Sequence, residues 1–215
     1  SRSGNSLINR KMILRVLGVL LAIEAILLLV SGCVSAIYDE ADYIYFVYCA
    51  LLNLGVGSVL VWLGRHADNT VTRRDGYCIV AFTWLLFTAF GMLPFYISGA
   101  IPSIPNAFFE TMSGFTTTGA TILDDIEALS HGMLFWRSFT QWIGGLGIIF
   151  FTIAVLPIFG VGNQVLFSAE ATGVIHDKIH PKISVMAKWL WLIYLLITGS
   201  LIILLLIGGM DLFDA

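Results

Sequence analysis

The chain has 215 residues, of which 58% are hydrophobic and only 12% are charged, and its formal net charge is −3. Because soluble domains carry about 25% charged residues, this composition excludes an ordinary soluble protein. Apolar runs of about 20 residues recur along the chain, and each is long enough to cross a hydrocarbon core as a helix. We therefore predict an all-α membrane protein with several transmembrane helices.

Five membrane spans are predicted from the apolar runs and their flanks, at residues 13–37, 43–63, 77–97, 135–158 and 188–207. Lys and Arg residues gather before the first span, between the second and third, and between the fourth and fifth. Acidic residues gather in the segments on the other side, at Asp39, Glu40, Asp42, Asp124, Asp125 and Glu127. By the positive-inside rule, this alternation places the N-terminus in the cytoplasm.

The first span carries two features that allow more than one interpretation. Glu24 lies inside it, and a carboxyl group there is either functional or held by a polar group of a neighbouring helix. Arg10, Lys11 and the apolar run that ends in "VSGC" at Cys33 resemble a lipoprotein signal peptide. The run is long for such a peptide, so we favour a permanent span.

Between the third and fourth spans lies a segment that is too short and too polar to cross the membrane. Pro102 and Pro105 are expected to break any helix, and Ser103 to cap a new one. The stretch "NAFFETMSG" then predicts about two helical turns. Because "FTTTGAT" and the acidic "LDDIE" follow, we expect the chain to enter the membrane from the outer side and return to it.

A re-entrant segment of this kind has the layout of a selectivity filter. A short helix directs the negative end of its dipole toward a central cavity, and extended residues after it present carbonyl oxygens that replace the hydration shell of an ion. Thr116, Thr117 and Thr118 would supply such carbonyls, and Gly119 would adopt backbone angles closed to other residues. The alternative is an external turn rich in threonine and glycine.

The segment after this loop contains one basic residue and a group of glycines. Arg137 is expected either to pair with Asp124 or Asp125 behind the filter or to reach the outer interface. The glycines are expected to lie on one helix and allow close packing, with a hinge as the alternative. They are Gly144, Gly145 and Gly147.

The inner segment before the last span offers little chemistry. His176 and His180 have the i, i+4 spacing that can hold zinc, but no third ligand is evident and Pro181 follows at once. We interpret this segment as a cytoplasmic surface. Glu24 and these histidines converge on no nucleophile–base or metal arrangement, so an enzyme is not predicted.

Two stretches, "FFETMSGFTTTGATIL" and "RSFTQWIGGLGIIFF", together resemble the membrane subunits of the Trk/Ktr/HKT superfamily. The resemblance is nearest to the bacterial Trk-type (TrkH-like) potassium uptake proteins. The first stretch is similar to the first pore loop of that family, and the second to the helix that follows it. The C-terminal "DLFDA" resembles the approach to the second pore loop.

The resemblance implies four helix–pore loop–helix repeats around one pore, preceded in Trk-type members by a helix pair. Residues 1–12 would be a tail, 13–76 the helix pair, 77–158 the first repeat, 159–187 a cytoplasmic connector and 188–215 the start of the second repeat. Each filter loop of the family contributes one glycine. Gly119 matches the first, and glycine rather than serine points to potassium over sodium. Since three pore loops are missing, we expect an N-terminal part of a longer protein.

The resemblance further implies potassium uptake across the bacterial inner membrane, with potassium as the transported substrate and no cofactor in this chain. The implied partners are membrane lipid, a second copy of the full protein and a cytoplasmic nucleotide-binding regulatory subunit (TrkA-like), but no nucleic acid. The alternative is a non-conducting membrane scaffold or assembly subunit, if the chain is naturally this short.

Overall fold

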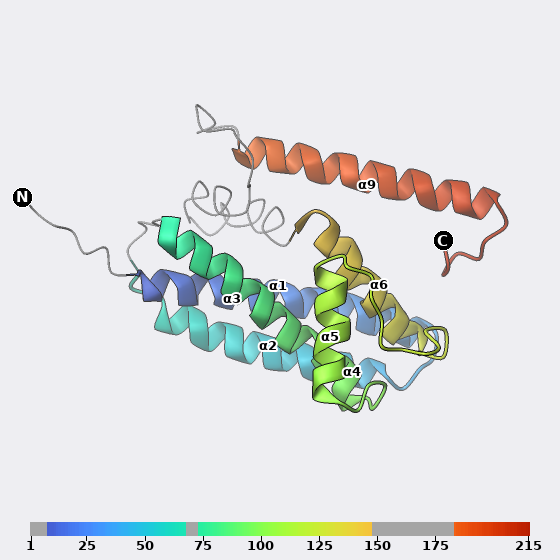
Figure 1. Cartoon of the computed structure of the whole chain (residues 1–215), viewed down its shortest axis with the longest axis horizontal. Coiled ribbons are helices and arrows are strands. Elements are labelled where there is room, and N and C mark those ends of the chain that lie inside the picture. Colours follow the sequence, from blue (N-terminus) through green and yellow to red (C-terminus); the bar gives the residue numbers. More distant parts are fainter. Residues whose placement is uncertain (1–7, 68–72, 148–182) are drawn as a thin grey trace, which may run out of the picture.

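The computed structural model describes residues 8–67, 73–147 and 183–215, and every regular element in these ranges is α-helical. The elements in chain order are α1 Arg10–Ile37, α2 Tyr43–Leu63, α3 Arg73–Gly91, α4 Leu93–Ile97, α5 Ile104–Phe115, α6 His131–Gly145 and α9 Ile183–Ile207. Helices α1, α2 and α3 lie side by side, with α5 and α6 at one end of this bundle and α9 along its side (Figure 1). The predicted all-α class is confirmed.

Within the described residues, four segments are long and apolar enough to cross a membrane, namely Arg10–Ile37, Tyr43–Leu63, Arg74–Ile97 and Lys188–Ile207. They confirm the first, second, third and fifth predicted spans. The third is not one continuous helix, because α3 ends at Gly91 and α4 begins at Leu93 with a proline in its first turn. The fourth predicted span, 135–158, is described only as far as residue 147, where α6 supplies its first part.

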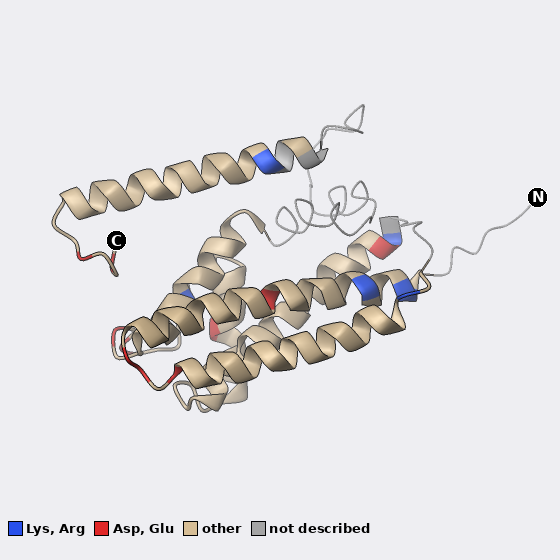
Figure 2. Cartoon of the chain, turned by 180° about the vertical axis from the view of Figure 1, so that it is seen from behind, with Lys and Arg blue, Asp and Glu red and all other residues tan. Residues whose placement is uncertain are grey.

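Charged residues are separated along the bundle. Most basic residues lie near the end that carries the N-terminus, and the acidic turns lie at the opposite end, as Figure 2 shows. Asp75 is an exception at the basic end, where it accepts a hydrogen bond from the Asn9 N–H at 2.8 Å. The acidic end is also the end at which α6 begins and α2 begins.

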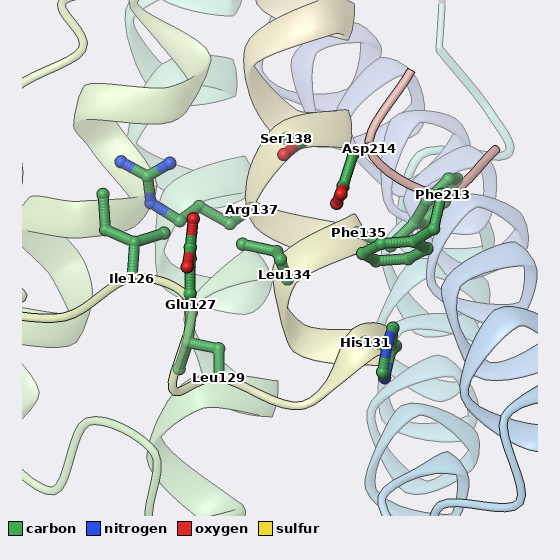
Figure 3. Close-up of a pocket in the computed structure, with 10 residues that line it drawn as sticks. All are labelled: Ile126, Glu127, Leu129, His131, Leu134, Phe135, Arg137, Ser138, Phe213 and Asp214. Carbon is green, nitrogen blue, oxygen red and sulfur yellow. The ribbon is translucent and has the colours of Figure 1, made fainter. Parts of the chain in front are cut away.

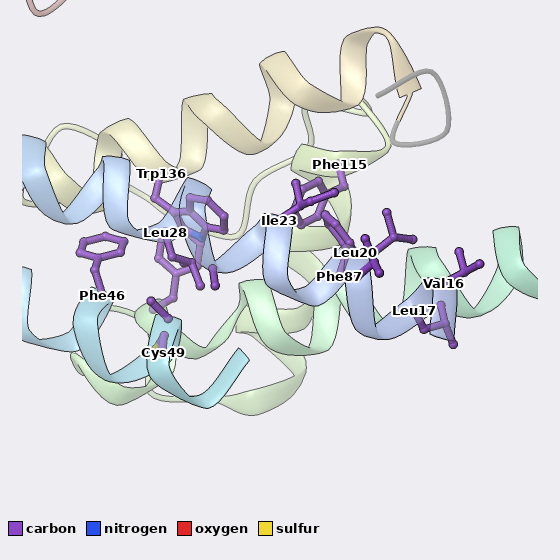
Figure 4. Close-up of a cluster of buried hydrophobic side chains, with 14 of the residues drawn as sticks. Val16, Leu17, Leu20, Ile23, Leu28, Phe46, Cys49, Phe87, Phe115 and Trp136 are labelled. Atoms are coloured by element: carbon purple, nitrogen blue, oxygen red, sulfur yellow. The ribbon is translucent and has the colours of Figure 1, made fainter. Parts of the chain in front are cut away.

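The first two helices pack closely along most of their length, because glycines face one another across the interface. A Cβ atom at Gly18 would collide with the backbone of α2 near Gly57, and one at Gly57 with the backbone of α1. Small residues of this kind allow membrane helices to approach and gain dispersion energy. The core continues from this pair into the rest of the bundle through Leu28, Phe46 and Phe87 (Figure 4).

The turn between α1 and α2 caps the start of α6. The Glu40 carboxylate accepts the N–H groups of His131 and Gly132 at 2.7 and 3.1 Å, and the His131 imidazole Nδ1 lies 2.7 Å from the same carboxylate. Partial burial opposes ionisation of Glu40, but the hydrogen bonds from Gly132 and His131 outweigh it and hold the Glu40 pKa below its ordinary value. A negative charge at a helix N-terminus is favourable, so this contact ties the helix pair to α6.

We predict that this cap makes stability depend on pH. In the full-length protein, Glu40→Gln should lower the free energy of unfolding by about 1 kcal/mol near neutral pH, because a charge-assisted cap is lost. Since the pKa of Glu40 is depressed in the native state, the advantage of the wild type should shrink as pH falls below about 4.3, the ordinary glutamate value. Thermal unfolding in detergent between pH 3.5 and 7 measures both effects.

Asp39→Asn is the matched control, since Asp39 is an exposed acid of the same turn. It should leave the midpoint unchanged at every pH. A pH-independent loss in Glu40→Gln would contradict the ionised cap.

Candidate functional site

Helix α5 starts where the sequence suggested, but for a different reason. Ser103 is its N-cap residue, with extended backbone angles of φ −92° and ψ 124°, yet its side chain makes no capping hydrogen bond. Pro105 lies inside the first turn, where its missing N–H needs no intrahelical partner. The expected position of Ser103 at the start of a new helix is confirmed, although its hydroxyl makes no capping bond. The expectation that Pro105 breaks any helix is wrong, because Pro105 lies in the first turn of α5, and α5 is longer than the predicted two turns.

Helix α5 ends in a Schellman motif made by the threonines of the loop. The Thr117 N–H donates to the Gly114 carbonyl at 2.9 Å, and the Thr118 N–H to the Ser113 carbonyl at 3.0 Å. The motif requires left-handed backbone at Thr117, whose φ is 56°. This conformation costs a β-branched residue roughly 1–2 kcal/mol. Because Thr116 also keeps helical angles, the expectation that the loop is extended from its first residue is wrong.

Gly119 is the second residue of the loop with left-handed backbone, at φ 75°. A Cβ atom at this position would meet nothing within 4 Å. The position therefore calls for glycine because of its backbone angles and not because of crowding. The predicted backbone conformation of Gly119 is confirmed, whereas its part in ion binding stays a prediction.

The loop uses its hydrogen-bond donors internally and leaves its acceptors open. The N–H groups of residues 116–119 all donate to carbonyls in the last turns of α5, at 2.9 to 3.5 Å. The Thr116 hydroxyl donates to the Met112 carbonyl at 2.7 Å and lies 2.8 Å from the Thr118 hydroxyl. Within the described part of the chain, no hydrogen bond reaches the carbonyl oxygens of residues 116–119, and all four residues are exposed.

A buried ion pair holds the returning limb of the loop against α5. The Glu110 carboxylate is 2.7 Å from the Arg137 Nε atom of α6, and Glu110 is only 2% exposed. The same carboxylate accepts the Thr121 hydroxyl at 2.9 Å and the Ile122 N–H at 3.0 Å. Three donors, from Thr121, Ile122 and Arg137, make four contacts with this one carboxylate. Because they come from two segments of the chain, they fix the loop relative to both helices.

This geometry corrects the sequence analysis of Arg137. Its partner is Glu110 and not Asp124 or Asp125, and its side chain lies behind the loop and not at the outer interface. Sequence reasoning missed Glu110 altogether. The sequence did contain an indication of this pair. Glu110 is an acidic residue inside a short apolar helix, and such a residue needs a cationic partner when it is buried. Arg137 is the basic residue that departs from the separation of basic and acidic segments.

Glycines also bring α5 and α6 into backbone contact. A Cβ atom at Gly144 would collide with the backbone of Phe115, and one at Gly114 with the Thr140 side chain. The Phe115 ring continues this contact edge-to-face with Trp136, whose indole N–H donates to the Gly91 carbonyl at 2.8 Å. Close packing is thus confirmed for Gly144.

The other two glycines of this group play different parts. Gly145 lies against the hydroxyl of Tyr194 in α9, which donates to the Trp142 carbonyl at 2.9 Å. Gly147 follows the C-cap residue Leu146 and has φ 76°, so it lies beyond the end of α6. The interpretation that all three glycines pack on one helix is wrong for Gly147, which supplies left-handed backbone at the helix end.

Glu24 of α1 is fully buried inside the helix bundle. Its carboxyl faces the Asn53 amide of α2, and one of its oxygens lies 2.8 Å from the position that a Cβ atom of Gly91 would occupy. Neither side chain has a polar atom within hydrogen-bonding geometry of another described group. Helix packing leaves both the functional and the structural interpretation of Glu24 open.

One side of α5 borders an open, mainly apolar groove of about 510 Å³. It runs past Pro105, Phe108 and Met112 to Thr116 and Thr118 of the loop. The described residues contain no group of three or more His, Cys, Asp or Glu side chains that could hold a metal ion. His176 and His180 lie outside the described residues, as does most of the predicted cytoplasmic connector.

Comparisons with known proteins agree on one family. The family model described as TrkH, cation transport protein, matches residues 45–210. The chain is 40% identical over 205 residues to the Trk system potassium uptake protein TrkH of Escherichia coli K12, covering 94% of this chain and 42% of that protein. It is 34% identical to an uncharacterized cation transporter of Methanocaldococcus jannaschii, covering 94% of this chain and 42% of that protein.

A solved structure resembles the fold as well. The crystal structure of the potassium transporter TrkH from Vibrio parahaemolyticus matches with a TM-score of 0.77 and 33% identity, covering 95% of this chain and 41% of that one. The chain thus spans about 42% of the length of the curated relatives that it matches. These relatives are named as transporters, and together with the apolar helices they establish a multi-pass membrane protein.

We predict that Glu110 and Arg137 depend on each other. In the full-length protein, Arg137→Met should lower the free energy of unfolding by about 3–5 kcal/mol, because it strands a buried carboxylate. Glu110→Gln should cost less in the presence of Arg137→Met than in its absence. Thermal unfolding of the two single variants and the double variant gives the coupling energy. Additive losses would contradict the ion pair as the fixed contact behind the loop.

Proposed function

The chain belongs to the TrkH family of cation transport proteins, and from this premise we propose that it supplies one of several pore loops through which potassium ions cross the membrane. The observation that carries the proposal is the loop at residues 116–119. Its backbone N–H groups all donate to carbonyls of α5, while its carbonyl oxygens accept no hydrogen bond and its residues are exposed. Such a surface offers neutral oxygen ligands and no free backbone donor.

The barrier to transport is the removal of water from the ion, and neutral carbonyl oxygens offset it for a hard monovalent cation. We propose Thr116, Thr117, Thr118 and Gly119 as the residues whose carbonyls bind potassium. Left-handed backbone at alternate positions, Thr117 and Gly119, supports this assignment. In a β-strand, successive carbonyls point to opposite sides. Left-handed backbone angles at every second residue remove this alternation, so successive carbonyls can point to the same side. The C-terminal end of α5, adjacent to these carbonyls, adds a negative dipole end.

One copy of this loop cannot surround an ion, so we propose that the whole protein provides further loops. In this scheme residues 13–76 form a preceding helix pair, 77–158 the first helix–pore loop–helix repeat, 159–187 a cytoplasmic connector and 188–215 the start of a second repeat. The open groove along α5 supports the scheme, because it is the side on which a pore axis and further repeats would lie.

We further propose the setting in which this pore works. The separation of basic and acidic ends supports a cytoplasmic N-terminus, and the bacterial relatives support the inner membrane (Figure 2). The family supports a homodimer of the full protein and a nucleotide-binding regulatory subunit on the cytoplasmic face. Transport, and not catalysis, is the proposed activity, with potassium as its substrate.

Gly119→Ser in the full-length protein tests the filter assignment. A serine side chain strains the left-handed backbone and moves the adjacent carbonyls, so discrimination between potassium and sodium should fall about tenfold, or about 1.4 kcal/mol. Competitive uptake of rubidium and sodium into proteoliposomes measures the ratio. Gly99→Ser is a matched control, because Gly99 has φ 78°, also meets nothing within 4 Å of a Cβ position, and lies outside the loop. Equal selectivity in the two variants would refute the assignment.

A further inference from the structure

Three segments that are far apart in the sequence meet around the ring of His131. Tyr38, at the end of α1, stacks on the imidazole with ring centroids 4.1 Å apart and planes 2° apart. Phe213, which follows α9, meets the imidazole nearly at right angles with centroids 4.6 Å apart, and meets Tyr38 at 5.3 Å. His131 itself begins α6. The helix pair, α6 and the C-terminal segment therefore share one aromatic cluster.

The cluster borders a pocket of about 580 Å³ at the acidic end of the bundle (Figure 3). The pocket is lined by α6, by the loop before it and by the segment that contains Phe213 and Asp214. Helix α9 is otherwise tied to α6 about midway along its length, where the Trp142 indole N–H donates to the Thr198 hydroxyl at 3.0 Å. The His131 cluster is a second attachment, beyond the end of α9.

The charged groups around His131 are mainly acidic. The Glu40 carboxylate accepts a hydrogen bond from the Nδ1–H group of His131. The Asp42 carboxylate of the same turn accepts one from the hydroxyl of the neighbouring Ser130. Among the pocket residues, Glu127 comes from the loop before α6, Arg137 from α6 and Asp214 from the C-terminal segment. The Arg137 side chain is engaged by Glu110. Of these groups only an imidazole ordinarily changes its charge between about pH 5 and 8.

We propose that His131 positions the segment that follows α9, and that protonation of its ring tightens this contact. The proposal rests on the proposed function, since in that scheme the segment leads into the second pore loop. In the neutral ring, the Nδ1–H group donates to Glu40 and the contacts with Tyr38 and Phe213 are those of uncharged rings. In the protonated ring, the bond to Glu40 becomes an ion pair, and the cation lies 4.1 Å from the ring centroid of Tyr38 and 4.6 Å from that of Phe213.

As a consequence, the segment after α9 should be better ordered at low pH than at high pH, on the side of the membrane that faces the acidic end of the bundle. Tyr38 and Glu40 belong to a turn that is anchored to α6, so the platform stays in place while the strength of the contact to Phe213 changes. Because the segment leads into the second pore loop in the proposed scheme, uptake should follow the same pH dependence.

The direct test measures order and not transport. Spin labels are attached at Ile37→Cys and Leu212→Cys in the full-length protein, with the native cysteines replaced; both sites are highly exposed, at 76% and 77%. The distance distribution should be narrow at pH 5.5 and broader at pH 8. His131→Gln should give the broad distribution at both values. A distribution in the wild-type background that does not change with pH would overturn the proposal.

The functional test follows rubidium uptake into proteoliposomes as the external pH is changed from 8 to 5.5. The wild type should accelerate about threefold, the size of a cation–π contact at an exposed site. His131→Gln and Phe213→Leu should each remove this response, and the double variant should lose no more than either. His66→Gln is the matched control, since His66 is an exposed histidine at the opposite end of the bundle, and should retain the response.

The two tests separate the failure of the inference from the failure of the proposed function. A pH-dependent distance distribution in a protein that transports no cation would retain the positioning role and refute the function. Normal potassium uptake with an unchanged pH response in both His131→Gln and Phe213→Leu would refute the positioning role alone. Loss of the response in His131→Gln but not in Phe213→Leu would also refute it, because the segment would then not be involved.

Discussion

The structure depends on how the loop after α5 satisfies its backbone hydrogen-bonding groups. Within a membrane every backbone N–H and C=O group needs a partner from the protein, from water or from a ligand. Residues 116–119 meet this demand for donors only, because the carbonyls at the end of α5 accept all four N–H groups. A loop with free amides would attract anions, as helix N-termini and amide nests do. Here the backbone groups without a hydrogen bond are acceptors, which is the arrangement that the proposed binding of a cation requires.

The strained backbone follows from the same demand. The Schellman motif that absorbs the N–H groups needs a left-handed residue at position 117, where glycine is usual and this chain has threonine. Strain of this kind persists only where neighbouring contacts over-determine the conformation. Glu110 and Arg137 provide those contacts on one side, and the backbone contact between Phe115 and Gly144 provides them on the other. The loop is thus clamped at both ends while its carbonyls remain free.

The sequence predicted the helices and the loop, but not the contacts of Glu110 with Arg137 and of Phe115 with Gly144 that fix the loop. Apolar runs and charge asymmetry predicted the spans, since length and hydropathy are local properties of the chain. The loop was located by its threonines and Gly119, again a local pattern. The partner of Arg137 was not found, because pairing between residues 27 positions apart depends on how α5 and α6 pack. The helical angles of Thr116 and the left-handed backbone of Thr117 were missed for a related reason. A β-branched residue in left-handed backbone contradicts local preference and is held there by tertiary contacts.

The acidic residues at the loop end of the bundle belong mainly to the architecture. From the sequence they could be taken as a field that concentrates cations near the pore. In the structure Glu40 caps α6, Asp42 accepts the Ser130 hydroxyl and Asp125 accepts the Glu127 N–H. Each of these charges is partly neutralised by donors, and Glu110 is paired outright with Arg137. In the proposed function, attraction of the cation would therefore rest on the short-range carbonyl oxygens and the end of α5 more than on a diffuse surface charge that salt would screen.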